Sequence, residues 1–321
     1  MPVHPWLADK FELIRGIPSF AAAATDPGYG ARLLDYLQDP QPWSPPADVV
    51  SEIATAGGVR LRVFRPAAPT GALLWMHGGG FVMGSVDDTE STVPGYELAS
   101  RAGVTVVSVD YRLAVDGVRY PAPLEDVLEA WRWLATLGFP DRRLFLGGAS
   151  VGAGLAVSAA VRLRDANAPM PHGLLLAYPI LHFPVPPASP DPSYDLDRDL
   201  DELPSMLRFP TEFQAGVVQN YAGRLDDLPA DVVPGNHAVD GLPEAFLAPA
   251  EYDDLRPSGD RFAEQLVEAG VAAHVHLARG MVHGYLGRTP TLEPVSAVLD
   301  FFADALRGTS IDSPSDTDTA R

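Results

Sequence analysis

The sequence predicts an α/β protein built on a mostly parallel β-sheet that is flanked by helices. Short apolar runs alternate with amphipathic stretches through most of the chain, which is typical of strands covered by helices. Two earlier runs, 49–56 and 58–65, are separated by Gly57-Gly58. They predict a hairpin, and therefore an antiparallel edge on that sheet.

Six further apolar runs are the predicted strands of the sheet, at 71–77, 104–112, 143–150, 173–181, 244–253 and 272–279. Between and after them lie amphipathic stretches that predict helices, at about 88–102, 123–138, 151–166, 258–270 and 294–307. This alternation of strand and helix is the pattern of βαβ units, and it places the parallel strands side by side.

Two segments depart from the alternation. Residues 1–45 show helix-like patterns that end in a proline-rich stretch, and residues 183–235 are rich in Pro and Asp. Plain loops of that length are uncommon inside a domain. We therefore expect both segments to form a helical cap over a core made of 46–182 and 236–307. The polar tail, 308–321, is expected to be disordered.

Composition excludes several kinds of partner and chemistry. The formal net charge is −19, and a field of that sign repels nucleic acid and anionic membranes. The chain has no cysteine, which excludes disulfides and thiolate metal sites and fits a cytoplasmic protein. No secretion signal is recognisable at the start of the chain. The sequence is compatible with a homodimer but does not set the oligomeric state.

The stretch Gly148-Ala149-Ser150-Val151-Gly152 is the first candidate for catalytic chemistry. It follows an apolar strand and opens an alanine-rich helix. A sharp strand-to-helix turn presents a serine hydroxyl freely, and glycines two residues before and after it avoid collisions in that turn. The helix also directs its first N–H groups at developing negative charge. Ser150 is therefore the predicted nucleophile.

A second motif, His77-Gly78-Gly79-Gly80, follows a buried strand. Three successive glycines leave main-chain N–H groups bare, so that they can converge on one oxygen, as an oxyanion hole requires. The predicted donors are the N–H groups of Gly79, Gly80 and Val151. His77 is expected to fix this loop by hydrogen bonding and not to act as a base.

These motifs occur with four others in one order along the chain: HGGG, DYRLA (110–114), YPAPLED (120–126), GASVG, AEYDDLR (250–256) and VHG (282–284). In this order they resemble the hormone-sensitive-lipase-like esterases, the bacterial family IV group of the α/β-hydrolase fold. The resemblance covers roughly residues 45–305 and implies an α/β-hydrolase fold with a helical cap.

The resemblance also implies the remaining members of a catalytic triad. The acid of this family lies in a D-x-L-R stretch, which makes it Asp253; the neighbouring Asp254 is a carboxylate that sequence reasoning alone does not separate from it. The base is then His283, just before Gly284. The chain order Ser, Asp, His is the order found in α/β-hydrolases.

The chain departs from the family at the turn itself, where G-D-S-A-G-G is usual. Ala149, Val151 and Ala153 replace the acid, the alanine and the second glycine. None of these changes removes a catalytic atom, because Val151 contributes only its N–H group. A β-branched residue beside the oxyanion is stiffer and bulkier, so we expect effects on substrate range and rate, not on the fold.

Together these features imply a serine carboxylesterase that acts on small, short-acyl esters through an acyl-enzyme, without a cofactor or metal. Two alternatives stay open. One is a non-catalytic receptor for a small ligand, like the plant gibberellin receptors, which are similar to this family but lack the triad histidine. The other is an acyltransferase or amidase that uses the same triad, because the pocket chooses the acceptor.

Several other polar residues are expected to have no catalytic role. Asp110 and Arg112 are expected to form structural ion pairs, with Glu125 or Asp126 as partners. His274 and His276 alternate on a strand and share one face, but no third metal ligand accompanies them in the sequence. Aromatic residues of the cap that are candidates for the pocket wall are Trp6, Phe11, Phe209 and Phe213.

Overall fold

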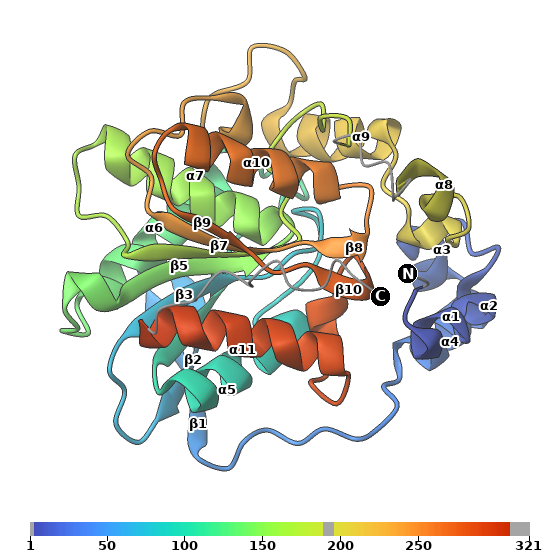
Figure 1. Ribbon diagram of the computed structural model, residues 1–321, viewed down its shortest axis with the longest axis horizontal. Helices are drawn as coiled ribbons and strands as arrows, with labels where there is room; N and C mark the ends of the chain where they lie inside the picture. The colour runs from blue at the N-terminus through green and yellow to red at the C-terminus, as the bar shows by residue number, and fades with distance from the viewer. Residues whose placement is uncertain (1–2, 189–195, 309–321) are drawn as a thin grey trace, which may run out of the picture.

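The computed structural model describes residues 3–188 and 196–308. At its centre lies an eight-stranded sheet with the strand order β1-β2-β4-β3-β5-β6-β7-β9, next to a two-stranded sheet of β8 and β10 (Figure 1). The strands are β1 (Val49–Ala56), β2 (Val59–Pro66), β3 (Ala72–Met76), β4 (Thr105–Asp110), β5 (Leu144–Ala149), β6 (Gly173–Ala177), β7 (Glu244–Ala248), β8 (Ala250–Tyr252), β9 (Ala273–Val275) and β10 (Ala278–Val282).

The strand pairing confirms the predicted sheet. The pairs β1–β2 and β2–β4 are antiparallel, and the other pairs of neighbouring described strands are parallel. The hairpin turns at Gly57-Gly58, where Ala56 lies opposite Val59. The fold class is therefore α/β, with a mostly parallel sheet and an antiparallel edge.

Helices cover both faces of the sheet, as predicted. The helices α5 (Thr89–Ala102) and α11 (Glu293–Arg307) pack on one face, and α6 (Ala122–Ala135), α7 (Val151–Asp165) and α10 (Arg256–Glu268) pack on the other (Figure 1). Single turns of 3-10 helix lie at Asp141–Arg143, Ser205–Leu207, Pro234–Asn236 and Tyr285–Gly287.

Alternation along the central strands divides the core in two. In β3, Leu73 and Trp75 join the apolar cluster under α5 and α11, whereas Leu74 and Met76 join the cluster under α6, α7 and α10. All four side chains are fully buried. A strand buried on both faces appears in the sequence as a continuous apolar run, which is why ALLWM was recognisable as a strand.

Two predicted strands are each divided into two, which corrects the prediction. The run 244–253 becomes β7 and β8, and the run 272–279 becomes β9 and the start of β10. Pro249 lies at the first break, and its carbonyl oxygen accepts a hydrogen bond from Ala278 N (2.9 Å). Because proline has no N–H to donate, the ladder changes partner there: β7 pairs with β9, and β8 pairs with β10.

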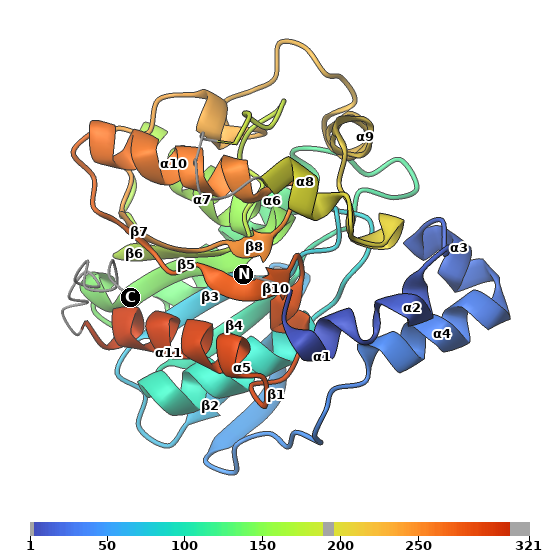
Figure 2. The same cartoon turned by 45° about the vertical axis from the view of Figure 1, so that its right-hand side comes forward.

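The two segments outside the alternation contain short helices. Residues 1–45 form α1 (Pro5–Ala8), α2 (Phe11–Ile14), α3 (Phe20–Thr25) and α4 (Pro27–Leu37), and residues 183–235 contain α8 (Leu196–Leu200) and α9 (Thr211–Ala222). The helices of both segments lie toward the same end of the molecule (Figure 2). Ser205 Oγ links them through a hydrogen bond to Ile17 O (3.4 Å). Their role as one cap stays a prediction.

The described helices and the predicted tail bear on two further expectations, the lack of a membrane span and the disorder of residues 308–321. None of the described helices has both the length and the apolar character that crossing a membrane requires. The predicted disordered tail, 308–321, lies outside the described residues except for Gly308, which follows α11.

We expect that Leu74→Ala lowers the free energy of unfolding by about 2–5 kcal/mol, because it removes buried methyl groups and leaves a cavity in the core. Leu34→Ala is the matched control, since 66% of Leu34 is exposed, and it should change stability by no more than about 0.5 kcal/mol. Urea denaturation followed by circular dichroism measures both. Equal losses in the two variants would contradict the described core.

Candidate active site

Ser150 lies in a strained turn between β5 and α7. Its φ and ψ are 55° and −121°, a region that non-glycine residues rarely adopt and that costs about 1–3 kcal/mol. The flanking glycines permit it: a Cβ on Gly148 would lie 2.5 Å from Gly152 C, and one on Gly152 would lie 2.3 Å from His77 O. The turn therefore has the geometry that the sequence predicted for a nucleophilic serine.

Three side chains that are far apart in the sequence meet at this turn. His283 Nε2 lies 2.9 Å from Ser150 Oγ, and His283 Nδ1 lies 2.7 Å from Asp253 Oδ2. The second oxygen of Asp253 accepts a hydrogen bond from Leu255 N (2.9 Å). Each residue follows the carboxyl end of a strand, namely β5, β8 and β10, so the topology itself brings them together.

The surroundings of His283 favour its charged form. The side chains of His283 and Asp253 are 10% and 0% exposed. Burial opposes protonation of the imidazole, but the charge and hydrogen bond of Asp253, together with the charges of Glu90 and Asp254, raise its pKa above the ordinary value of 6.5. An imidazolium formed during a reaction would therefore be stabilised.

Asp254 has a different partner from Asp253. Its carboxylate accepts hydrogen bonds from Arg208 Nη2 (3.0 Å) and Phe209 N (2.6 Å). The ring of Phe209 then packs against that of His283, with centroids 4.6 Å apart. Of the two adjacent carboxylates, Asp253 contacts the imidazole, and Asp254 fixes the segment that covers it; the assignment of Asp253 as the acid stays a prediction.

The glycine loop after β3 lies beside Ser150. Gly79 and Gly80 have φ of 94° and 62°, which glycine adopts without strain. Among the described residues, no backbone acceptor pairs with the N–H groups of Gly79, Gly80 or Val151. His77 Nδ1 lies 2.9 Å from Gly78 O, and burial lowers the pKa of His77, so it fixes the loop as predicted.

Comparisons with known proteins agree with this architecture. A family model described as the α/β-hydrolase fold matches residues 73–287. Esterase LipI of Mycobacterium tuberculosis is 35% identical over 72% of this chain and 72% of its own. An ethyl acetate hydrolase of Pseudomonas putida is 31% identical over 75% of this chain and 74% of its own.

The chain belongs to the hormone-sensitive-lipase-like carboxylesterases of the α/β-hydrolase fold. Among solved structures, a hyperthermophilic esterase from Pyrobaculum calidifontis superimposes with a TM-score of 0.75 at 27% identity, covering 97% of this chain and 100% of that one. The family recognised from six short motifs is thereby confirmed, and so is its fold.

Other residues weighed in the sequence of this carboxylesterase lie away from the row of Ser150, His283 and Asp253. Arg112 pairs with Asp126 (2.8 Å), as expected, and Asp110 pairs with Arg60 (3.1 Å), which was not. His274 pairs with Glu244 (2.8 Å) and stacks on a phenylalanine ring. These contacts are structural.

The four aromatic candidates for the pocket wall separate into two groups. Phe209 contacts His283, and Phe213 packs on Phe209 with centroids 5.3 Å apart. Trp6 instead lies under the cations of Lys10 and Arg288. Phe11 lines a separate cavity with Tyr252. Of the four, only Phe209 is therefore placed against the imidazole, and Phe213 packs on its ring.

Two residues near Ser150 and His283 were not found by sequence reasoning. Tyr178 follows β6 and packs against His283, with ring centroids 4.8 Å apart. Glu90 accepts hydrogen bonds from Gly78 N and Tyr178 Oη, each 2.6 Å long. The only available signal for Tyr178 was its place after a buried strand next to β5; nothing local distinguishes Glu90 from a solvated helix residue.

We expect Asp253→Asn to lower kcat by about 10⁴-fold, because an amide favours the wrong imidazole tautomer. Asp254→Asn should retain most of the rate, since Asp254 contacts Arg208 and Phe209 instead of His283. Ester hydrolysis by the two isosteric variants measures the difference. A larger loss in Asp254→Asn would show that the acid has been assigned to the wrong neighbour.

Proposed function

We propose that this carboxylesterase hydrolyses small, short-acyl esters through an acyl-enzyme on Ser150. The observation that carries the proposal is the continuous row of hydrogen bonds from Asp253 to His283 to Ser150. The oxyanion site beside that row is proposed to consist of the N–H groups of Gly79, Gly80 and Val151. The name of the Pseudomonas putida relative supports a small ester.

Attack begins when Ser150 Oγ forms a bond to the carbonyl carbon of the ester. His283 Nε2 takes the hydroxyl proton, and Asp253 holds the imidazole with Nδ1 protonated and stabilises its charge. The electron pair of the carbonyl moves to its oxygen. When the tetrahedral intermediate collapses, the ester C–O bond breaks and the alkoxide leaves with the proton from Nε2. A water molecule then attacks the acyl carbonyl carbon while His283 Nε2 takes its proton. The second tetrahedral intermediate collapses, the bond to Ser150 Oγ breaks, and the proton returns to that oxygen as the carboxylic acid leaves.

The developing oxyanion needs donors that are already in place. The three proposed N–H groups come from the glycine loop and from the first residue of α7, whose N-terminus adds a favourable dipole. Each such donor contributes roughly 3 kcal/mol to lowering the barrier. Since these donors belong to the main chain, Val151 can replace the usual alanine without removing one of them.

The proposed acyl preference rests on the space behind Val151. A cavity there has a volume of about 20 Å³, and its lining includes Phe81, Leu155, Val217 and Tyr221. Such a volume holds little more than one water molecule. We infer that the acyl group is directed toward this cavity, so that a long chain would require its wall to move.

We expect purified protein to hydrolyse p-nitrophenyl acetate and butyrate, with kcat/KM falling at least about tenfold by the octanoate because each misplaced methylene costs about 1 kcal/mol or more. Ser150→Ala should lower kcat by about 10⁴-fold or more. A chain-length series with both proteins measures these values.

Three results would contradict the proposed function or favour one of its alternatives. Equal activity of Ser150→Ala would overturn the nucleophile. Absence of hydrolysis combined with tight binding of a small ligand would favour the receptor alternative. Faster cleavage of matched anilides, or faster transfer to added alcohols than to water, would favour the amidase or the acyltransferase.

The pH dependence follows from the base. Protonated His283 cannot accept the Ser150 proton, so kcat/KM should fall as the pH drops through the pKa of His283. Because that pKa is raised above 6.5, the half-maximal point of the acidic limb should lie above 6.5 in the free enzyme. A pH profile of kcat/KM measures it, and a half-maximal point below 6.5 would contradict the described environment.

The homodimer, the cytoplasmic location and the cap formed by 1–45 and 183–235 stay predictions.

A further inference from the structure

Glu90 is a carboxylate that forms hydrogen bonds to two parts of the candidate site. It lies in the first turn of α5. Its Oε2 accepts the N–H of Gly78 (2.6 Å), and its Oε1 accepts the hydroxyl of Tyr178 (2.6 Å). Both oxygens are thus engaged by short, charge-assisted hydrogen bonds, which are about twice as strong as neutral ones.

Each of the two bonds leads to one of the proposed reacting groups. Gly78 precedes the two glycines whose N–H groups form the proposed oxyanion site. The ring of Tyr178, which is 1% exposed, packs edge-on against His283 and against Tyr285 (4.9 Å). The position of the Glu90 carboxylate therefore affects both the N–H donors of the glycine loop and the imidazole of His283.

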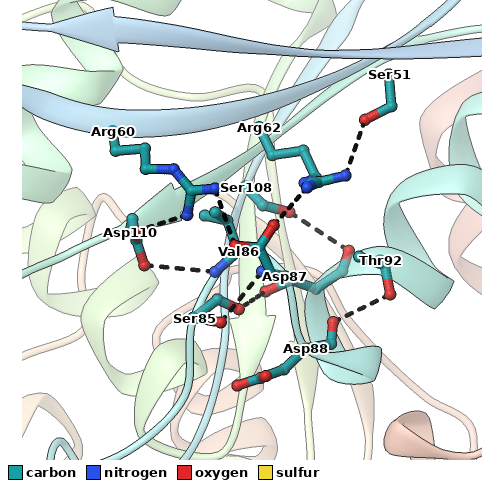
Figure 3. A network of polar contacts seen from close by, with 11 residues as sticks. Ser51, Arg60, Arg62, Ser85, Val86, Asp87, Asp88, Thr92, Ser108 and Asp110 are labelled. Atoms are coloured by element: carbon teal, nitrogen blue, oxygen red, sulfur yellow. Dashed lines mark hydrogen bonds and ion pairs between the residues drawn. The ribbon is translucent and has the colours of Figure 1, made fainter.

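The backbone of Glu90 and the loop before it are fixed by further contacts. Trp75 Nε1 donates to its carbonyl oxygen (2.9 Å). The preceding loop is fixed to β2 by ion pairs of Asp87 with Arg60 and Arg62, and Val86 N donates to Asp110 (3.4 Å) (Figure 3). A carboxylate on so restrained a segment can fix the position of its partners.

The charge of Glu90 also reaches several titratable groups. Burial is the main cause of the raised pKa of Tyr178, and Glu90 adds to it, so the phenol stays a neutral donor. Asp253, Tyr178 and Ser150 contact His283, and the charges of Glu90 and Asp254 act on it from further away. After burial, which lowers the pKa of His283, and Asp253, which raises it, Glu90 is the next contributor to the raised value.

We propose that Glu90 is a positioning residue that joins the oxyanion loop, through Gly78, to the platform under His283, through Tyr178. The proposal rests on the proposed function, because it assigns the support of the same site. In the reaction Glu90 takes no part in proton transfer; it holds the glycine loop through Gly78 and adds negative charge beside the imidazole.

Three variants test the charge and the contact separately. Glu90→Ala removes both hydrogen bonds and should lower kcat ten- to a hundredfold with KM changed less than about threefold, as expected of a misplaced donor set. Glu90→Gln keeps the shape but loses the charge, so the acidic limb of kcat/KM should move to lower pH. Tyr178→Phe keeps the ring and the charge of Glu90, so kcat should fall while the limb stays in place.

Glu97→Gln is the matched control. Glu97 lies two turns further along α5, is 7% exposed, and binds Trp43 Nε1 (2.7 Å) and Arg101 (2.8 Å) away from the triad. Its substitution should lower the melting temperature and leave kcat, KM and the pH profile unchanged. It thus shows what a purely structural carboxylate on this helix does.

The proposal is overturned if the Glu90 variants behave like Glu97→Gln, with a lower melting temperature but an unchanged kcat and acidic limb. If Glu90→Ala does not fold, Glu90→Gln and Tyr178→Phe decide by the same criteria. Ser150→Ala, assayed in parallel, distinguishes a failure of the proposed function from a failure of the role of Glu90. Equal hydrolysis by Ser150→Ala overturns the proposed function, and the Glu90 role with it, whereas Ser150-dependent hydrolysis with unaffected Glu90 variants overturns only the role of Glu90.

Discussion

The close approach of α7 to the end of β3 is the constraint on which the site depends. At Gly152 the backbone of the helix comes so near to the carbonyl oxygens of Met76 and His77 that no side chain fits, since a Cβ there would lie 2.3 Å from each. This contact turns the chain sharply at Ser150 and places it beside the glycine loop. The strain at Ser150 is balanced by the core behind it, where β5 and the part of α7 from Val151 to Val161 are buried.

Much of this arrangement could be predicted from local sequence. The two glycine motifs are contiguous, and their chemistry depends on backbone conformation, so a few residues suffice to predict it. The central strands, such as β3, β5 and β6, are apolar runs because both of their faces are buried. The division at Pro249 was missed because an apolar run carries no information about which neighbour it pairs with.

Contacts made across the fold were harder to predict. Asp253 and Asp254 are adjacent, and only the path of the chain after β8 decides which carboxylate meets His283 and which meets Arg208. Glu90 and Tyr178 are 88 residues apart and have no motif in common. Their contact follows from the strand order, which brings the ends of β3, β5 and β6 together.

The pairing of Asp254 with the backbone of Phe209 has a mechanical consequence. The turn that carries Asp253 is connected on one side to the imidazole and on the other to the segment whose phenylalanine ring covers it. A displacement of that segment by a bulky substrate would pull on the same turn. The segment of Phe209 and the imidazole of His283 are thus attached to one turn through two neighbouring carboxylates.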